Sequence, residues 1–183
     1  SDIACFSFNG NKLITTGGGG MITTSNDAWA EKARYLTTQA KDDPVEYIHS
    51  EIGYNYRLTN VQAAIGLAQI DRVEEFISKK LSIAKLYDES FTSNKSITLL
   101  PKRPGSEPVY WLYTLLLDDT TPLEKRKLIV SELNQKGIGV RPIFHPLHAL
   151  PLYKNNLSYH MDHSLNIYRR ALSIPSSVGL TRE

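Results

Sequence analysis

Lys12 is the residue of this sequence whose surroundings point most clearly to chemistry. A short apolar run, residues 3–8, ends in a polar turn that presents this lysine, and four consecutive glycines follow at 17–20. A partly buried lysine loses its proton more easily than a solvated one and can then act as a Schiff-base nucleophile. Ser7 and the glycine amides would offer hydrogen-bond donors to an anion such as a phosphate. A solvated turn lysine beside a simple hairpin turn is the alternative; a P-loop is excluded, because no Gly-Lys-Ser/Thr follows.

A second candidate site is the segment Gly-Tyr-Asn-Tyr-Arg at residues 53–57, directly before a predicted long helix. Helix N-termini favour anions, because their unpaired backbone N–H groups and the helix dipole point toward that end. Asn55 and Arg57 are therefore candidate phosphate ligands. The structural alternative is that Asn55 caps a turn and Arg57 pairs with a carboxylate.

The third candidate is the segment Arg-Pro-Ile-Phe-His-Pro-Leu-His at residues 141–148. Arg141 and His148 suit contacts with an anionic or hydroxyl-rich substrate. Two histidines three residues apart also raise the question of a metal, but Pro146 excludes a regular helix interior and no third ligand lies nearby in the sequence. We therefore predict no metal site.

The elements that must position these residues alternate between strands and helices. Up to residue 91 we expect strands over 3–8, 13–16 and 21–24, a short helix over 28–36, and one long helix from the Thr59–Gln62 capping box to about 91. After a turn-rich break at 101–108 we expect strands over 109–117 and 139–144, helices over 123–136 and 161–172, and a short extended end. The alternation after residue 108 predicts a small α/β lobe. A long helix such as the one that ends near residue 91 usually links two lobes, so we expect an α/β fold with two domains, 1–91 and 92–183.

Composition and charge restrict the class of protein and the kinds of partner that are expected. The chain has 183 residues, 41% of them hydrophobic and 22% charged, which suits a globular protein of one or two domains. A net charge of +2 gives no strong field for nucleic acid or a membrane, and no apolar run approaches the roughly 20 residues of a membrane span. Cys5 is the only cysteine, so an internal disulfide is excluded and a buried structural thiol is expected. Without a signal-peptide pattern, we expect a cytoplasmic protein.

Three separate segments together resemble one family. Residues 6–21 with the lysine and the glycines, residues 53–69 (GYNYRLTNVQAAIGLAQ), and Gly-Val-Arg-Pro at 139–142 with the following Pro-Leu-His are similar in order and spacing to the DegT/DnrJ-type sugar aminotransferases. These are pyridoxal-phosphate enzymes of the aspartate aminotransferase fold. The resemblance covers essentially the whole chain but only the C-terminal half of the family's usual length. It therefore implies a truncated fold, in which 1–91 is the C-terminal part of the cofactor-binding large domain, ending in a long interdomain helix, and 92–183 is the small α/β domain.

The resemblance also implies roles for individual residues. Lys12 would form the internal aldimine with pyridoxal 5′-phosphate, and Ser7 would bind the cofactor phosphate within the same subunit. Asn55 would reach the phosphate of the neighbouring subunit's cofactor, so the active site would require a homodimer. The remaining candidates are expected to bind substrate: Arg57, Arg141 and His148.

The activity that the resemblance implies is transamination of a 4-keto-6-deoxy nucleotide sugar, with L-glutamate as amino donor, in cell-surface polysaccharide or glycan biosynthesis. Some relatives that dehydrate sugars carry histidine at the lysine position, so Lys12 favours transamination over dehydration. The Asn-Gly-Asn-Lys turn with four glycines is most similar to members that aminate UDP-4-keto-6-deoxy-N-acetylhexosamines.

The resemblance is also incomplete. The family's aspartate that pairs with the pyridine nitrogen lies upstream of this sequence, and residues 181–183 resemble the start of a helix that does not continue. We therefore expect an incomplete fragment that, as an isolated polypeptide, binds the cofactor poorly and has no useful turnover. A sugar dehydratase and a non-catalytic partner module remain the alternatives.

Overall fold

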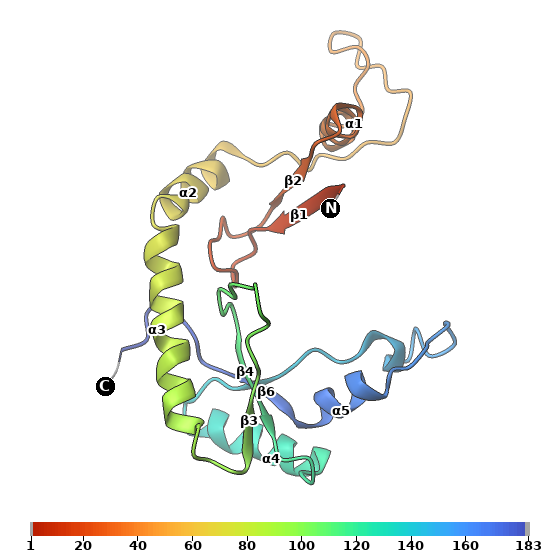
Figure 1. Cartoon of the computed structure of the whole chain (residues 1–183). Coiled ribbons are helices and arrows are strands. Elements are labelled where there is room, and N and C mark those ends of the chain that lie inside the picture. Colours follow the sequence, from red (N-terminus) through yellow and green to blue (C-terminus); the bar gives the residue numbers. More distant parts are fainter. Residues whose placement is uncertain (1, 182–183) are drawn as a thin grey trace. The chain divides into compact units, whose positions relative to one another are not determined.

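The computed structural model describes residues 2–181, which divide between Phe76 and Ile77 into two compact units (Figure 1). The boundary falls inside helix α3 (Val73–Phe91). The prediction of one continuous helix from Thr59 to residue 91 is wrong, because α2 (Asn60–Ile70) ends in a turn before α3 begins. Acidic residues occupy the first turn of α3, where carboxylates favour the start of a new helix. The helix predicted to start at 181 falls mostly outside the described residues.

The first unit contains a two-stranded antiparallel sheet. Strand β1 (Ile3–Ser7) pairs with β2 (Gly20–Thr24), in a register that sets Ser7 opposite Gly20. Helix α1 (Asp27–Thr37) follows, capped by the side chain of Asn26, which accepts a hydrogen bond from the N–H of Trp29 at 3.2 Å. The strand predicted over 13–16 is wrong: these residues lie in the loop between β1 and β2.

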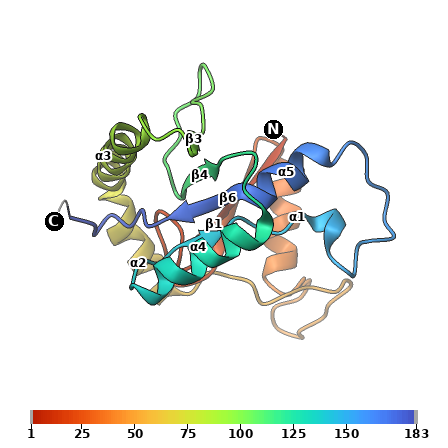
Figure 2. The ribbon, with the colours of Figure 1, turned by 90° about the horizontal axis from the view of Figure 1, so that it is seen from below.

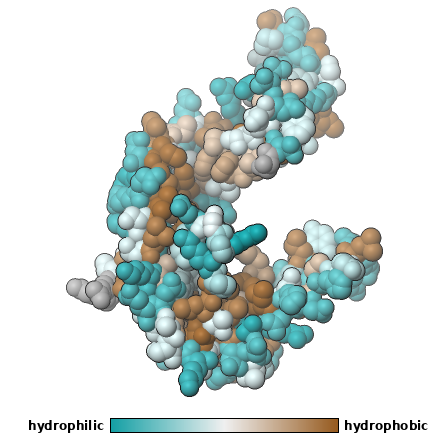
Figure 3. All heavy atoms as spheres, in the orientation of Figure 1, coloured by the Kyte–Doolittle hydropathy of each residue, from teal (hydrophilic) through white to brown (hydrophobic). Residues whose placement is uncertain are grey.

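The hydrophobic side chains of the first unit are largely exposed. Phe6 of β1 is 50% exposed, and Figure 3 shows hydrophobic side chains at the surface of α2, where Val61 is 71% exposed. The expected burial of Cys5 as a structural thiol is therefore wrong: Cys5 is exposed, as are the other residues of β1 except the half-buried Ala4. Three described residues of the unit are buried: Thr16, Ala40 and Phe76.

The second unit is built on a four-stranded antiparallel sheet. Its strands, in spatial order, are β3 (Ile97–Leu99), β4 (Tyr113–Leu117), β6 (Ala171–Ile174) and β5 (Arg141–Pro142). Helix α4 (Leu123–Gln135) runs across one face of this sheet (Figure 2). Its side chains pack on a buried cluster of four residues: Leu115, Leu117, Val140 and Leu172.

The predicted helices of the second unit are confirmed as α4 and α5 (Asp162–Arg170), but its strands differ. The segment predicted as a short extended end is β6, a buried central strand, and β3 has no counterpart among the predicted strands. The strand predicted over 139–144 is reduced to two residues, because Pro142 has no N–H to donate to a ladder. No helix in the described part of the chain is both long and apolar enough to cross a membrane.

Candidate active site

Ser7 and Lys12 lie in one turn at the end of β1. Ser7 is the last residue of the strand, and its Oγ accepts a hydrogen bond from the backbone N–H of Asn9 at 3.4 Å. The backbone N–H of Lys12 donates to the carbonyl of the same Asn9 at 3.0 Å. Lys12 is half-buried and Ser7 is exposed. The turn therefore presents an amine and a hydroxyl from one short segment.

The four glycines close the loop between β1 and β2. Gly17 and Gly19 have φ values of 77° and 82°, a region that residues with a side chain rarely adopt. A Cβ on Gly20 would lie 2.4 Å from the carbonyl oxygen of Phe6, so a glycine is required for the strands to pair here. The hairpin interpretation of the run is confirmed, and binding of an anion by its amides stays a prediction.

The segment that contains Asn55 and Arg57 is hydrogen-bonded to the C-terminal end of α1. Three backbone hydrogen bonds join the two: Tyr54 N to Leu36 O at 2.7 Å, Gln39 N to Tyr54 O at 3.0 Å, and Tyr56 N to Thr37 O at 3.0 Å. Gly53 permits this contact, because a Cβ there would lie 2.2 Å from the carbonyl carbon of Gln39. This tight packing fixes the backbone from which the side chains of Asn55 and Arg57 extend.

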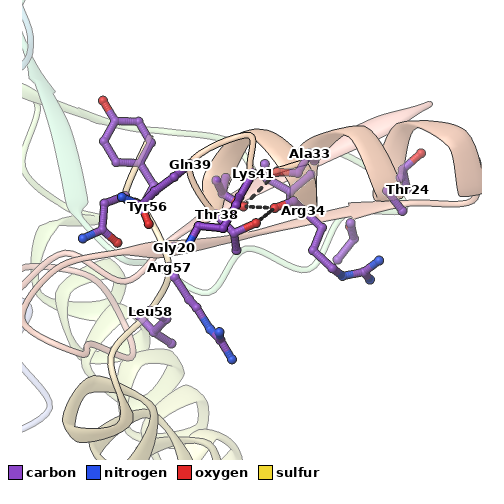
Figure 4. A pocket seen from close by; sticks show the side chains of 15 residues that line it. Gly20, Thr24, Ala33, Arg34, Thr38, Gln39, Lys41, Tyr56, Arg57 and Leu58 are labelled. Carbon is purple, nitrogen blue, oxygen red and sulfur yellow. Dashed lines mark hydrogen bonds between the residues drawn. The ribbon is translucent and has the colours of Figure 1, made fainter. Parts of the chain in front are cut away.

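Asn55 and Arg57 line a cavity of about 1130 Å³ together with residues of β2 and α1 (Figure 4). Arg57 forms no ion pair with any described residue, so none of these residues supports the alternative in which it pairs with a carboxylate. Two further cations, Arg34 and Lys41, line the same cavity and were not among the predicted residues. Their place depends on how residues 53–57 pair with the end of α1, which no local pattern reveals.

Arg141 and His148 belong to the second unit. Arg141 is exposed at the start of β5, opposite Ser173 of β6. His148 lies in the short 3-10 helix Leu147–Ala149, and its Nε2 is buried without a hydrogen-bond partner among the described residues. The residue lines a mostly apolar cavity of about 740 Å³. Binding of substrate by Arg141 and His148 stays a prediction. The described residues contain no group of three or more His, Cys, Asp or Glu side chains placed to hold a metal ion.

All of residues 1–183 match the DegT/DnrJ/EryC1/StrS aminotransferase family. The chain belongs to this family. The predicted α/β fold of aminotransferase type is confirmed by a solved family structure, that of Helicobacter pylori PseC, an aminotransferase involved in the biosynthesis of pseudoaminic acid. The two match with a TM-score of 0.90 and 26% identity over 100% of this chain and 50% of that chain.

Three curated relatives are similar to this chain over nearly all of its length. EpsN of Bacillus subtilis is 38% identical over 97% of this chain, and the GDP-perosamine synthase of Caulobacter vibrioides is 37% identical over 98% of it. The UDP-4-amino-4,6-dideoxy-N-acetyl-beta-L-altrosamine transaminase of Campylobacter jejuni is 30% identical over 96% of it. The match covers 46%, 48% and 47% of these three proteins, so the chain spans about half the length of the curated relatives it matches.

The side chains at the two loops of the first unit suit pyridoxal phosphate, the cofactor of the family. Lys12 supplies the amine that the cofactor's aldehyde requires. Ser7, Asn55 and Arg57 supply the neutral and cationic hydrogen-bond donors that a phosphate requires. The individual roles of these residues stay predictions.

Proposed function

We propose that this chain takes part in the pyridoxal-phosphate-dependent transamination of a nucleotide-linked keto sugar, for cell-surface polysaccharide biosynthesis. The observation that carries the proposal is Lys12 in the turn after β1, within a chain that matches an aminotransferase family over its whole length. The names of two relatives, a GDP-perosamine synthase and a UDP-sugar transaminase, support a nucleotide sugar as substrate. The donor, L-glutamate, becomes 2-oxoglutarate, and its amino group replaces the keto oxygen of the sugar.

Each predicted residue has a separate task in this proposal. The cofactor, when bound, supplies an electron sink for the carbon that loses its proton. Lys12 holds the cofactor and, once its Nζ is released, takes the proton from Cα of L-glutamate as a general base. Ser7 and Asn55 hold the phosphate, with Asn55 acting across a homodimer. The sugar nucleotide is bound by Arg57, Arg141 and His148.

The nucleotide is proposed to be UDP, linked to a 4-keto-6-deoxy-N-acetylhexosamine. Support comes from the Asn-Gly-Asn-Lys turn with four glycines, which is similar to the enzymes that act on such sugars. A GDP-linked keto sugar is the second candidate. It is favoured by the 37% identity to a GDP-perosamine synthase, against 30% to the UDP-sugar transaminase.

The test uses the polypeptide that carries this sequence in its natural source, with its intact mass measured first. It is incubated with pyridoxal phosphate, L-glutamate and the UDP- or GDP-linked keto sugar, and the sugar product is analysed by mass spectrometry. We expect 2-oxoglutarate and an amino sugar, lost in Lys12→Ala and retained in the matched control Lys125→Ala, an exposed position on α4. Loss of water from the sugar without formation of 2-oxoglutarate would instead establish a dehydratase.

The isolated 183-residue chain is proposed to bind the cofactor poorly and to have no useful turnover. The proposal is supported by the chain's span of about half its relatives and by the exposed apolar surface of the first unit. With equimolar pyridoxal phosphate, we expect at most a weak absorbance band of lysine-bound cofactor. A strong band that disappears in Lys12→Ala would overturn this part of the proposal.

A further inference from the structure

We propose that the cavity between β2, the end of α1 and the segment after Gly53 binds the diphosphate of a sugar nucleotide, with Arg34 and Lys41 as ligands beside Arg57. The identity of the anion rests on the proposed function. The preference for an anion rests on the charges and contacts of the cavity itself. Arg34 and Lys41 lie outside the three segments that resemble the aminotransferases.

All the charged residues that line the cavity are cationic. Of the 15 residues that line it, three are cationic and none is acidic. Arg34 comes from the last turn of α1, Lys41 from the loop after it, and Arg57 from the segment before α2. In Figure 4 the side chains of Arg34 and Arg57 extend to the same side of the ribbon. Charge-assisted hydrogen bonds from such groups are the strong interactions of phosphate sites.

The acidic residues next to Lys41 in sequence accept hydrogen bonds from their own loop and from α1. The carboxylate of Asp42 accepts hydrogen bonds from the N–H of Ser50 at 2.6 Å and from the hydroxyl of Tyr35 at 3.0 Å. The bond from the Ser50 backbone is the main reason why the pKa of Asp42 is lowered. Asp43 accepts from two backbone N–H groups of the same loop, at 2.7 and 2.9 Å. Neither carboxylate lines the cavity.

The cations of the cavity are likewise not neutralised by a described carboxylate. Glu51, in the segment before Gly53, is bound by Lys32 and not by Arg34. The ammonium of Lys41 lies 4.5 Å from the ring centroid of Tyr47, a contact that orients the charge without cancelling it. Within the described residues, Arg34, Lys41 and Arg57 have no ion-pair partner. Three such charges around one cavity repel one another unless an anion is present.

The size of the cavity favours a nucleoside diphosphate over a lone phosphate. Its volume of about 1130 Å³ is slightly larger than the roughly 300–1,000 Å³ that is typical of small-molecule pockets. The cations also come from three separate segments, so they can contact several anionic oxygens. Gln39 and Asn55 also line the cavity and supply neutral hydrogen-bonding groups.

Direct titration of the 183-residue chain tests the proposal without catalysis. Isothermal titration calorimetry at low ionic strength compares UDP and GDP with uridine, which lacks the phosphates. We expect UDP and GDP to bind, uridine to bind at least tenfold more weakly, and added salt to weaken the nucleotides. Arg34→Gln and Lys41→Gln should each weaken UDP binding about five- to tenfold, and Lys125→Gln on α4 should leave it unchanged. Circular dichroism confirms that each variant is folded.

The same titration separates the two sources of phosphate. If pyridoxal phosphate binds in an Arg34- and Lys41-dependent manner and UDP and GDP do not, the cavity serves the cofactor and the diphosphate proposal is rejected. Equal binding of uridine and UDP, or wild-type affinity in the folded double variant, would reject it as well. Nucleotide binding that depends on Arg34 and Lys41 would support this site even if the transaminase assay failed, so the two proposals can fail separately.

Discussion

Gly53→Ala is expected to destabilise the first unit strongly, because a methyl group has no room at this position. An added Cβ would lie 2.2 Å from the carbonyl carbon of Gln39 and 2.3 Å from the backbone nitrogen of Ala40. Backbone atoms cannot yield without separating the segment after Gly53 from the end of α1, where three backbone hydrogen bonds join them. Overpacking costs roughly 1–3 kcal/mol, and each lost hydrogen bond about 1 kcal/mol. We expect a loss of about 3 kcal/mol, a large part of the roughly 5–15 kcal/mol that stabilises a domain.

Urea unfolding followed by tryptophan fluorescence measures this loss. In a Trp111→Phe background the signal comes from Trp29 of α1, within the first unit. Gly10→Ala is the matched control, since nothing lies within 4 Å of a Cβ at Gly10 and its backbone is not left-handed. Its free energy of unfolding should change by about 1 kcal/mol or less. If Gly53→Ala unfolds at the same urea concentration as Gly10→Ala, the packing argument for this segment is refuted.

Two further predictions concern the pH dependence of the second unit and the start of α2. Lys80 is 6% exposed and donates to the carbonyl of Trp111 at 3.0 Å and to Ser176 Oγ at 3.2 Å, and burial lowers its pKa from the ordinary value of 10.5. Between the two pKa values the unfolded chain therefore binds more protons than the folded chain, so the free energy of unfolding should rise with pH from the lowered pKa to 10.5. Urea unfolding between pH 8 and about 10.5 should show a steeper rise for the wild type than for Lys80→Met, and equal slopes would contradict this. Thr59→Ala should cost about 1 kcal/mol, because Thr59 Oγ1 accepts from the N–H of Gln62 at 3.3 Å; Thr59→Ser should retain most of it, and a loss equal to that of Thr59→Ala would argue against the cap.

Elements with a local signal could be predicted from the sequence. The capping box is present as predicted, with Thr59 Oγ1 accepting from Gln62 and the Gln62 side chain accepting from the N–H of Thr59. The Asn26 cap and the glycine run likewise mark the start of α1 and the turn between β1 and β2. Each of these signals depends on residues that are close together in the sequence, so the sequence alone contains the information needed to predict the element.

Features that depend on distant partners could not be predicted. The segment 171–174 has the composition of a short extended end, and only its pairing with β4 and β5 makes it a central strand. The apolar residues of β1 suggested burial, yet exposure depends on which other segments cover a strand. Backbone hydrogen bonds between residues 36–39 and 54–56 bring Arg34 and Lys41 to the same cavity as Arg57. No spacing in the sequence predicts that contact.

The central claim is that Lys12 is the cofactor lysine, and reductive trapping tests it most directly. The polypeptide that carries this sequence in its natural source is saturated with pyridoxal phosphate, treated with borohydride and digested, and the labelled peptides are quantified by mass spectrometry. We predict that Lys12 carries the largest share of the label, well above the exposed Lys125, and that Ser7→Ala lowers the share of Lys12 without changing that of Lys125. Labelling of Lys12 no greater than that of Lys125 would contradict the claim.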